Sequence, residues 1–227
     1  MEVTFLGHAA ISIKTKSHTI LIDPYLTGNP VAAIRADEVD ADAILVTHGH
    51  GDHLGDTVAI AKRTGALVVA CAELAGWLHK QGVRVHAMHL GGARAFAFGW
   101  VKFTLAFHGA GIDTPDGMVY GGNPAGILFR AEDKTIYHAG DTALFGDMKL
   151  IGQRHPIDLA MLPIGDNYTM GPEDALYAAE LLAPKAVMPI HYNTFELLRQ
   201  DAHQFVQQVR AKGIAAYEVK PGESVSV

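Results

Sequence analysis

The 227-residue sequence predicts an α/β fold in which two mixed β-sheets pack face to face with helices on the outer faces, a four-layer αββα sandwich. Two observations predict it. Each half of the chain opens with strands of an antiparallel meander and then continues into β-α-β units. In addition, no linker long enough to separate two domains interrupts the chain, so we expect residues 1–227 to form a single domain.

The first half is predicted from alternating apolar residues, followed by apolar runs that alternate with helical patterns. The run at 43–46 fits a strand that is buried on both faces, and it ends just before a cluster of histidines. The expected elements are strands at 3–5, 11–13, 18–23, 43–46, 66–71 and 83–87, with helices at 56–63 and 72–81.

The second half repeats this rhythm. Residues 108–123 form a Gly-rich loop with a Pro-Asp-Gly turn signal at 115–117, and Pro172 suits the first turn of a helix. The expected elements are strands at 93–98, 100–107, 125–131, 134–137, 159–162 and 186–190, helices at 172–182 and 195–212, and short strands up to residue 227.

Composition excludes several classes of function. With 18 Lys and Arg against 24 Asp and Glu, the net charge of −6 has the wrong sign for a protein that binds a phosphate backbone, so nucleic acid is not expected as a partner. Cys71 is the only cysteine, which rules out an internal disulfide or a thiolate-cluster metal site. No apolar run is long enough for a membrane span and the N-terminus lacks a basic secretion signal, so we expect a cytoplasmic protein without membrane contacts.

The chemistry is concentrated in the segment 47–53 (THGHGDH), which contains an H-x-H-x-D-H pattern. Imidazole and carboxylate groups bind divalent metals such as zinc, and His48, His50, Asp52 and His53 can be turned toward one point. The two intervening glycines leave the backbone free to make that turn. This pattern therefore predicts a metal site at the end of the preceding strand.

One loop cannot complete the coordination of two metal ions, so further ligands must come from other strand ends. His108, Asp141 and His191 each follow a predicted apolar strand. Ligands of α/β sheets gather at the carboxyl ends of the strands. We therefore expect these three side chains to lie beside the 48–53 motif.

The order of these motifs resembles the metallo-β-lactamase-fold superfamily of metal-dependent hydrolases, which have H-x-H-x-D-H, a His, a Gly-Asp and a His in succession. Further segments are similar to its small single-domain branch, near the ascorbate-phosphate lactonases. These segments are 5–9 (FLGHA), 20–24 (ILIDP), 165–172 (GDNYTMGP) and 189–194 (PIHYNT). The best-known lactamases of this superfamily use a cysteine as a ligand of the second metal ion. Here the only cysteine, Cys71, falls in a predicted core strand, so a β-lactam substrate is not expected.

The resemblance implies two divalent metal ions, with zinc expected and manganese or nickel as alternatives. It implies that His48, His50 and His108 hold one ion, that Asp52, His53 and His191 hold the other, and that Asp141 bridges them. It also marks Asp52 and His53 as candidate catalytic residues. A hydroxide bound between the ions would attack an ester-like bond of a small molecule, a phosphodiester, a lactone or a thioester. The alternative is a non-catalytic metal- or ligand-binding protein that retains the fold, and either form could assemble as a homo-oligomer.

Other polar residues near these motifs have two open interpretations each. His8 either contacts a ligand or the substrate, or is a structural histidine, while Asp23 either fixes a ligand imidazole or starts a turn. Asp56 either orients a ligand or caps the helix that follows. The residues that could line the pocket or contact substrate are His138, Asp166, Asn167 and Tyr168, although a helix-entry turn also explains the loop at 165–171.

Overall fold

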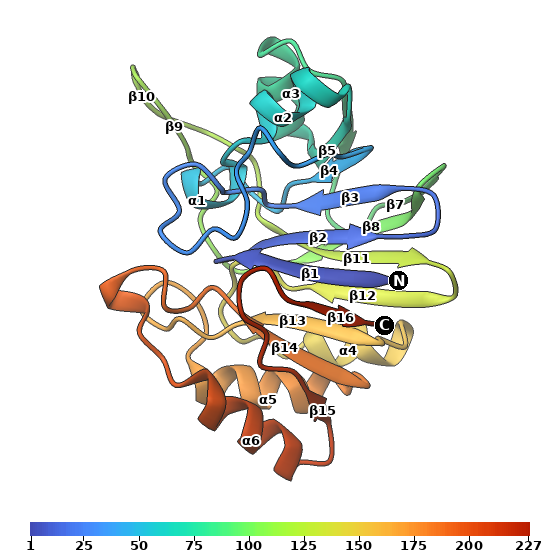
Figure 1. The fold of residues 1–227 in the computed structure, drawn as a ribbon, viewed down its shortest axis with the longest axis vertical. Coiled ribbons are helices and arrows are strands. Elements are labelled where there is room, and N and C mark those ends of the chain that lie inside the picture. Colours follow the sequence, from blue (N-terminus) through green and yellow to red (C-terminus); the bar gives the residue numbers. More distant parts are fainter.

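In the computed structural model, which describes residues 1–227, two seven-stranded mixed sheets pack face to face (Figure 1). The first sheet has the order β16-β1-β2-β3-β4-β5-β6. Its strands are β1 (Glu2–Gly7), β2 (Ala10–Lys14), β3 (Thr19–Ile22), β4 (Ala43–Leu45), β5 (Leu67–Cys71), β6 (Val85–Met88) and β16 (Ser224–Ser226). As predicted, β1 to β3 are antiparallel and β3 to β6 are parallel.

The second sheet has the order β15-β14-β13-β12-β11-β8-β7. Its strands are β7 (Ala93–Phe96), β8 (Gly99–Leu105), β11 (Ala125–Ala131), β12 (Lys134–His138), β13 (Leu159–Pro163), β14 (Ala186–Ile190) and β15 (Ala215–Ala216). Here too an antiparallel part, β7 to β12, continues into a parallel part, β12 to β15. The last strand, β16, returns to the first sheet and pairs with β1.

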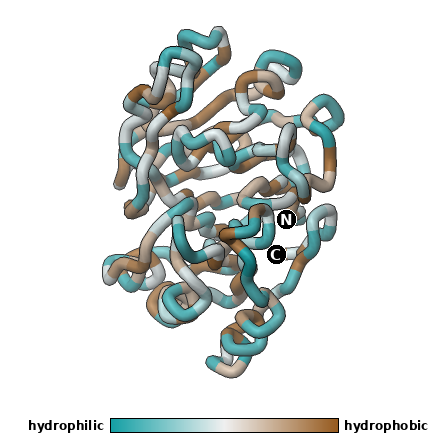
Figure 2. Tube along the Cα trace, turned by 90° about the vertical axis from the view of Figure 1, so that its left-hand side faces the viewer, coloured by the Kyte–Doolittle hydropathy of each residue, from teal (hydrophilic) through white to brown (hydrophobic).

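Three hydrophobic clusters fill the spaces between four layers. The largest lies between the sheets and includes Ile11, Leu45, Phe103 and Met161 from both of them. The other two join each sheet to its helices. Figure 2 shows hydrophobic stretches along the interior strands and hydrophilic residues in the outer turns. The predicted αββα sandwich is therefore confirmed.

The helices cover the outer faces of the sheets, as Figure 1 shows for α2 and α3 on one side and α5 and α6 on the other. The helices are α1 (Gly51–Leu54), α2 (Thr57–Thr64), α3 (Ala72–Lys80), α4 (Met148–Arg154), α5 (Pro172–Leu182) and α6 (Ala202–Ala211), with a 3-10 turn, η1, at Glu196–Leu198. The longest, α5, has 11 residues, and no helix meets the length and hydropathy that a membrane span requires.

The prediction of a helix at 195–212 was wrong for the first third of that range. The chain forms the short turn η1, and α6 begins only at Ala202 because the Asp201 side chain accepts a hydrogen bond from the Gln204 amide, 2.9 Å away. That bond satisfies a backbone donor which a helix start otherwise leaves free. Helix α4 was not predicted either, since Met148 is its only buried residue and leaves no apolar periodicity to detect.

The predicted loop at 108–123 contains a β-hairpin. Strands β9 (Ile112–Thr114) and β10 (Gly117–Val119) pair with each other alone and project from the body of the molecule (Figure 1). Only Ile112 of the two strands is buried. Such a pair lacks the alternating apolar face by which a strand is recognised in a sequence.

Candidate metal centre

The predicted metal ligands all lie where strands of the two sheets end. The 48–53 motif follows β4, and its Asp52 and His53 lie on the single turn α1. His108 comes shortly after β8, Asp141 shortly after β12, and His191 directly after β14. The seven side chains are brought together there, in groups whose nitrogen and oxygen atoms lie within 4.8 Å of one another.

One group consists of His48, His50 and His108. The Nε2 atom of His48 lies 3.0 Å from Nδ1 of His50, and the ring of His108 is 5.2 Å and 5.0 Å from those two rings. His48 is almost completely buried, whereas His50 and His108 are partly exposed. Three imidazoles at these separations suit one metal ion with an open position.

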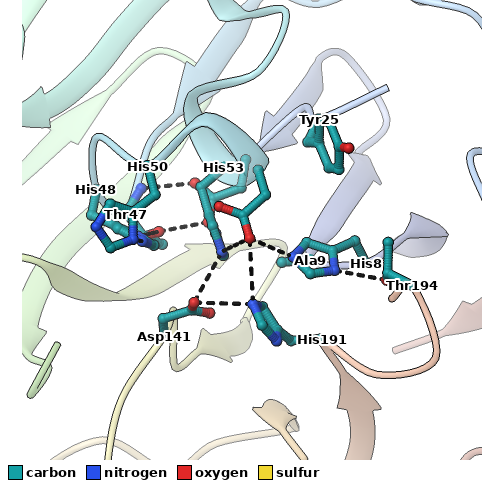
Figure 3. Close-up of polar contacts among 12 residues, drawn as sticks. His8, Ala9, Tyr25, Thr47, His48, His50, His53, Asp141, His191 and Thr194 are labelled. Atoms are coloured by element: carbon teal, nitrogen blue, oxygen red, sulfur yellow. Dashed lines mark hydrogen bonds and ion pairs between the residues drawn. The ribbon is translucent and has the colours of Figure 1, made fainter. Parts of the chain in front are cut away.

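A second group contains Asp52, His53, His191 and also His8. Asp52 Oδ2 lies 3.7 Å from His191 Nε2 and 4.0 Å from His53 Nε2. The two groups share Asp141, whose Oδ2 atom lies 3.2 Å from His53 Nε2, 3.0 Å from His191 Nε2 and 3.5 Å from His108 Nε2. One carboxylate oxygen therefore faces imidazoles of both groups, and Figure 3 shows its contacts with His53 and His191.

Several atoms of this cluster are buried without a hydrogen-bond partner. They are His53 Nε2, both ring nitrogens of His191, and Asp141 Oδ1. A buried polar atom without a partner is costly, and a cluster of such atoms calls for a ligand that satisfies them together. Imidazole nitrogens and carboxylate oxygens are the donors that divalent metals of the zinc type bind, so the residues present fit metal ions.

Electrostatics separate the histidines into two classes. Burial lowers the pKa of His48 well below its usual value and also lowers that of His108. Burial alone would also lower the pKa of His191, but the neighbouring Asp141 carboxylate raises it to about 9. The pKa of His53 is likewise held well above its usual value, because Asp141 and Asp23 outweigh the effect of burial. Neutral rings offer a lone pair at once, whereas a ring whose pKa is raised must first lose a proton to solvent before it can bind a metal ion.

The two carboxyl groups of the cluster stay ionised. Burial alone would raise the pKa of Asp141, but His191 and His53 hold it well below its usual value. Burial acts in the same direction on Asp52, whose pKa is likewise held far down by its contacts with His191 and His8. Two anionic side chains therefore lie among the imidazoles, and bound cations would neutralise their mutual repulsion.

Asp23 fixes the orientation of two ligand rings. Its Oδ2 atom lies 2.8 Å from His53 Nδ1 and accepts a 2.6 Å hydrogen bond from the Thr47 hydroxyl. Because that hydroxyl donates to Asp23, it accepts a hydrogen bond from His48 Nδ1, 2.9 Å away. Both rings thus carry a proton on Nδ1 and turn Nε2 toward the cluster. The ligand-fixing interpretation of Asp23 agrees with this contact, whereas the role of Thr47 was missed although it directly precedes the motif.

His8 contacts the cluster from the turn between β1 and β2. Its Nε2 atom lies 3.1 Å from Asp52 Oδ2, and its Nδ1 atom lies 2.7 Å from the Thr194 hydroxyl (Figure 3). Burial lowers the pKa of His8 to about 4, so the ring is neutral. Its backbone φ of 60° is a strained value for a residue with a side chain. Thr194 was also missed, because the residues it links are far apart in the sequence.

Other predicted residues occupy different positions. His138 is fully buried, with Nε2 donating to the Ala9 carbonyl and Nδ1 accepting from the Gly140 amide, so neither nitrogen is left for a substrate. Asp56 is the N-cap residue of α2, but its side chain forms no capping hydrogen bond and none with a predicted ligand. Its carboxylate accepts hydrogen bonds from the amides of Leu26 and Thr27, and so ties the loop after β3 to the motif.

The loop at 165–171 lies at the rim of the same edge. Asp166, Asn167 and Tyr168 are exposed, and none of them forms a hydrogen bond with the seven clustered residues. The loop is held through the Met170 amide, which donates to the carbonyl of Thr142, the neighbour of Asp141. Its three polar side chains therefore face solvent beside the cluster.

The comparisons with known proteins agree with this geometry. The beta-lactamase superfamily domain matches residues 18–192. A UPF0173 metal-dependent hydrolase from Shouchella clausii is 59% identical over 230 residues, covering 100% of both chains, and one from a Geobacillus strain is 58% identical over 228 residues with the same coverage. The chain belongs to the UPF0173 family of metal-dependent hydrolases.

Solved structures extend the comparison. This UPF0173 protein is similar to Igni18, a metallo hydrolase from Ignicoccus hospitalis, with a TM-score of 0.89, 34% identity and coverage of 99% of this chain and 97% of that one. An isothiocyanate hydrolase from Delia radicum gut bacteria shares the fold, with a TM-score of 0.77 at 21% identity and coverage of 100% and 99%. The predicted membership of the metallo-β-lactamase-fold superfamily is confirmed.

Proposed function

We propose that this protein is a hydrolase with two divalent metal ions that cleaves an ester-like bond, a phosphodiester, lactone or thioester, in a small molecule. His48, His50 and His108 would hold one ion, and Asp52, His53 and His191 the other. The observation that carries the proposal is the position of Asp141, whose Oδ2 atom lies within 3.5 Å of imidazole nitrogens from both groups. A carboxylate placed in this way suits a bridge between two ions.

When bound, a pair of divalent ions would supply Lewis acidity and bring the pKa of a shared water to about 7, so that a hydroxide nucleophile is present at neutral pH. The chain's own residues orient this centre. Asp23 and Thr47 hold the Nε2 lone pairs of His53 and His48 toward it. The proposal requires no side-chain nucleophile. Zinc is the proposed metal, with manganese or nickel as alternatives, and a cytoplasmic location is proposed with it.

The test is metal content together with turnover. Purified protein should hold close to two equivalents of metal, and His50→Ala and Asp141→Ala should each lose most of one. The matched control is His79→Ala, because His79 is an exposed histidine on α3. Full retention of metal in both site variants would defeat the ligand assignment.

Turnover is then measured with chromogenic phosphodiesters, lactones and thioesters in the presence of added zinc or manganese. We expect hydrolysis of at least one class, lost in Asp141→Ala and kept in His79→Ala. Two bound equivalents of metal without any turnover would instead support a non-catalytic binding protein.

A further inference from the structure

We propose that the substrate is an uncharged lactone or thioester whose apolar group lies against Tyr25 and Phe195. A substrate with an anionic group away from the reacting bond is not expected to bind. This inference rests on the proposed hydrolase function and narrows its substrate. It follows from which charges and which aromatic rings the chain places at the metal-bearing edge of the sheets.

Seven segments meet at this edge, joined by backbone hydrogen bonds such as His191 amide to His8 carbonyl and Ala143 amide to Phe107 carbonyl. They are 7–9, 23–42, 46–56, 106–124, 139–147, 164–171 and 191–200, of which 23–42 begins at this edge and crosses to the opposite one, where Asp42 accepts from the Thr19 amide. Arg35 and Arg199 are their only Lys or Arg residues, whereas every segment except the first contains at least one Asp or Glu. The edge is therefore poor in the cations that would recognise a distant phosphate or carboxylate.

Each arginine already faces a carboxylate of its own loop. The Arg35 guanidinium pairs with Asp37 at 2.6 Å, and that of Arg199 pairs with Glu196 at 3.2 Å. Several other basic residues sit at the opposite ends of the strands. Lys14 is the last residue of β2, whose first residue follows His8 closely, and Lys134 is the first residue of β12, which runs toward Asp141.

The charge balance favours a substrate that is neutral outside its reacting bond. Two divalent ions would interact with the reacting group itself and would stabilise the negative charge that develops on it. An anionic group further out would instead meet side chains such as Asp166, with no cation beside it to offset the repulsion. Enzymes that transfer phosphoryl groups commonly add Arg or Lys clamps around the metal, and none is present in these segments beyond the two paired arginines.

Aromatic rings supply an apolar wall on the side of the second metal group. The ring of Phe195 lies 5.8 Å from that of His8, and the ring of Tyr25 lies 5.9 Å from it. Figure 3 places Tyr25 on the side of the cluster away from Asp141. Phe195 is 42% exposed although it directly follows Thr194, which is hydrogen-bonded to His8. An exposed ring held this close to a reaction centre suits contact with an apolar group.

The test compares two metal-chelating ligands that differ by one distant charge. Octanohydroxamic acid and suberic monohydroxamic acid have the same chain length, and only the second ends in a carboxylate. Their affinities for the full-length protein, loaded with zinc, are measured by titration calorimetry. We expect octanohydroxamic acid to bind at least about tenfold more tightly, because it gains apolar contact and avoids repulsion.

Two substitutions of Phe195 refine the test. Phe195→Ala should weaken the binding of octanohydroxamic acid several-fold, with little effect on the binding of suberic monohydroxamic acid. Phe195→Lys should shift the binding preference toward suberic monohydroxamic acid, which ends in a carboxylate. Tyr177→Ala is the matched control, since Tyr177 is 54% exposed on α5, and it should change neither affinity. Metal content is checked in each variant.

Equal affinity for the two ligands, or tighter binding of the carboxylate, would overturn the substrate assignment and leave the hydrolase proposal intact. If neither hydroxamate binds to protein that holds two equivalents of zinc, an accessible metal centre is excluded, and the proposed function fails together with this inference.

Discussion

Asp23 and His53 form a completely buried pair in which the Asp23 carboxylate lies 2.8 Å from the ring nitrogen Nδ1 of a histidine in the metal-binding motif. The same carboxylate accepts from the amide and the hydroxyl of Thr47. Asp23 itself has a φ of 47°, in the left-handed region that residues other than glycine adopt only in a small share of cases. The fold therefore accepts local strain in order to hold a carboxylate behind the histidine cluster.

Asp23→Ala should lower the affinity for one metal ion by about 10- to 100-fold, because His53 loses the partner that fixes its orientation. Titration of the metal-free variant with zinc measures this effect. Asp42→Ala is a suitable control, since Asp42 accepts a backbone hydrogen bond from Thr19 at the far end of β3. An unchanged affinity in Asp23→Ala would show that the pair has no role in metal binding.

Thr47→Val removes one hydroxyl while it conserves the shape of the side chain. The hydroxyl is buried and lies between Asp23 and His48. We expect weaker binding of the ion held by His48 and a loss of about 1–3 kcal/mol in the free energy of unfolding, since buried groups lose a partner. Chemical denaturation and metal titration check both effects. Wild-type values in both measurements would contradict the role given to Thr47.

The two glycines of the motif should respond differently to alanine. At Gly49 an added Cβ would lie 2.6 Å from a side-chain carbon of Ile112 and 3.1 Å from the Ala110 carbonyl, so Gly49→Ala should reduce metal affinity and thermal stability. At Gly51 nothing lies within 4 Å, and the residue begins α1. Gly51→Ala should be neutral or stabilise by up to about 1 kcal/mol. Similar losses in both variants would refute the packing argument.

Metal binding should release protons in a pH-dependent way. The pKa of His191 is about 9 against an ordinary value of 6.5, so its ring is protonated near neutral pH in the metal-free protein. A metal ion that binds this ring must displace the proton, and the number released should fall as the pH rises through about 9. Calorimetry in buffers of different ionisation enthalpy measures this number. A release that is constant up to pH 10 would contradict it.

The same shift affects the stability of the metal-free protein. Because the folded-state pKa of His191 is raised, its contribution to stability is complete below about pH 6.5 and is lost as the pH rises toward about 9. Denaturation of the metal-free protein across this range should show the decrease, and saturating zinc should remove it. No decrease in the metal-free protein would count against a protonated His191.

Much of the fold and of the candidate metal-binding cluster could be predicted, because both depend on strong local patterns. His108, Asp141 and His191 each follow an apolar strand, and parallel strands bring such residues to a common edge. Thr47 and Thr194 could not be predicted, because their hydrogen bonds to Asp23 and His8 depend on tertiary packing between segments distant in the sequence. The projecting hairpin β9–β10 escaped detection because only Ile112 of its residues is buried, so no alternating apolar face is present.

The central claim is that one carboxylate lies between two metal ions. Crystals of the zinc-loaded protein, with diffraction data collected on both sides of the zinc absorption edge, test it most directly. We predict two anomalous peaks about 3.5–4 Å apart, both in contact with Asp141. A single peak, or two peaks of which Asp141 contacts only one, would contradict the account.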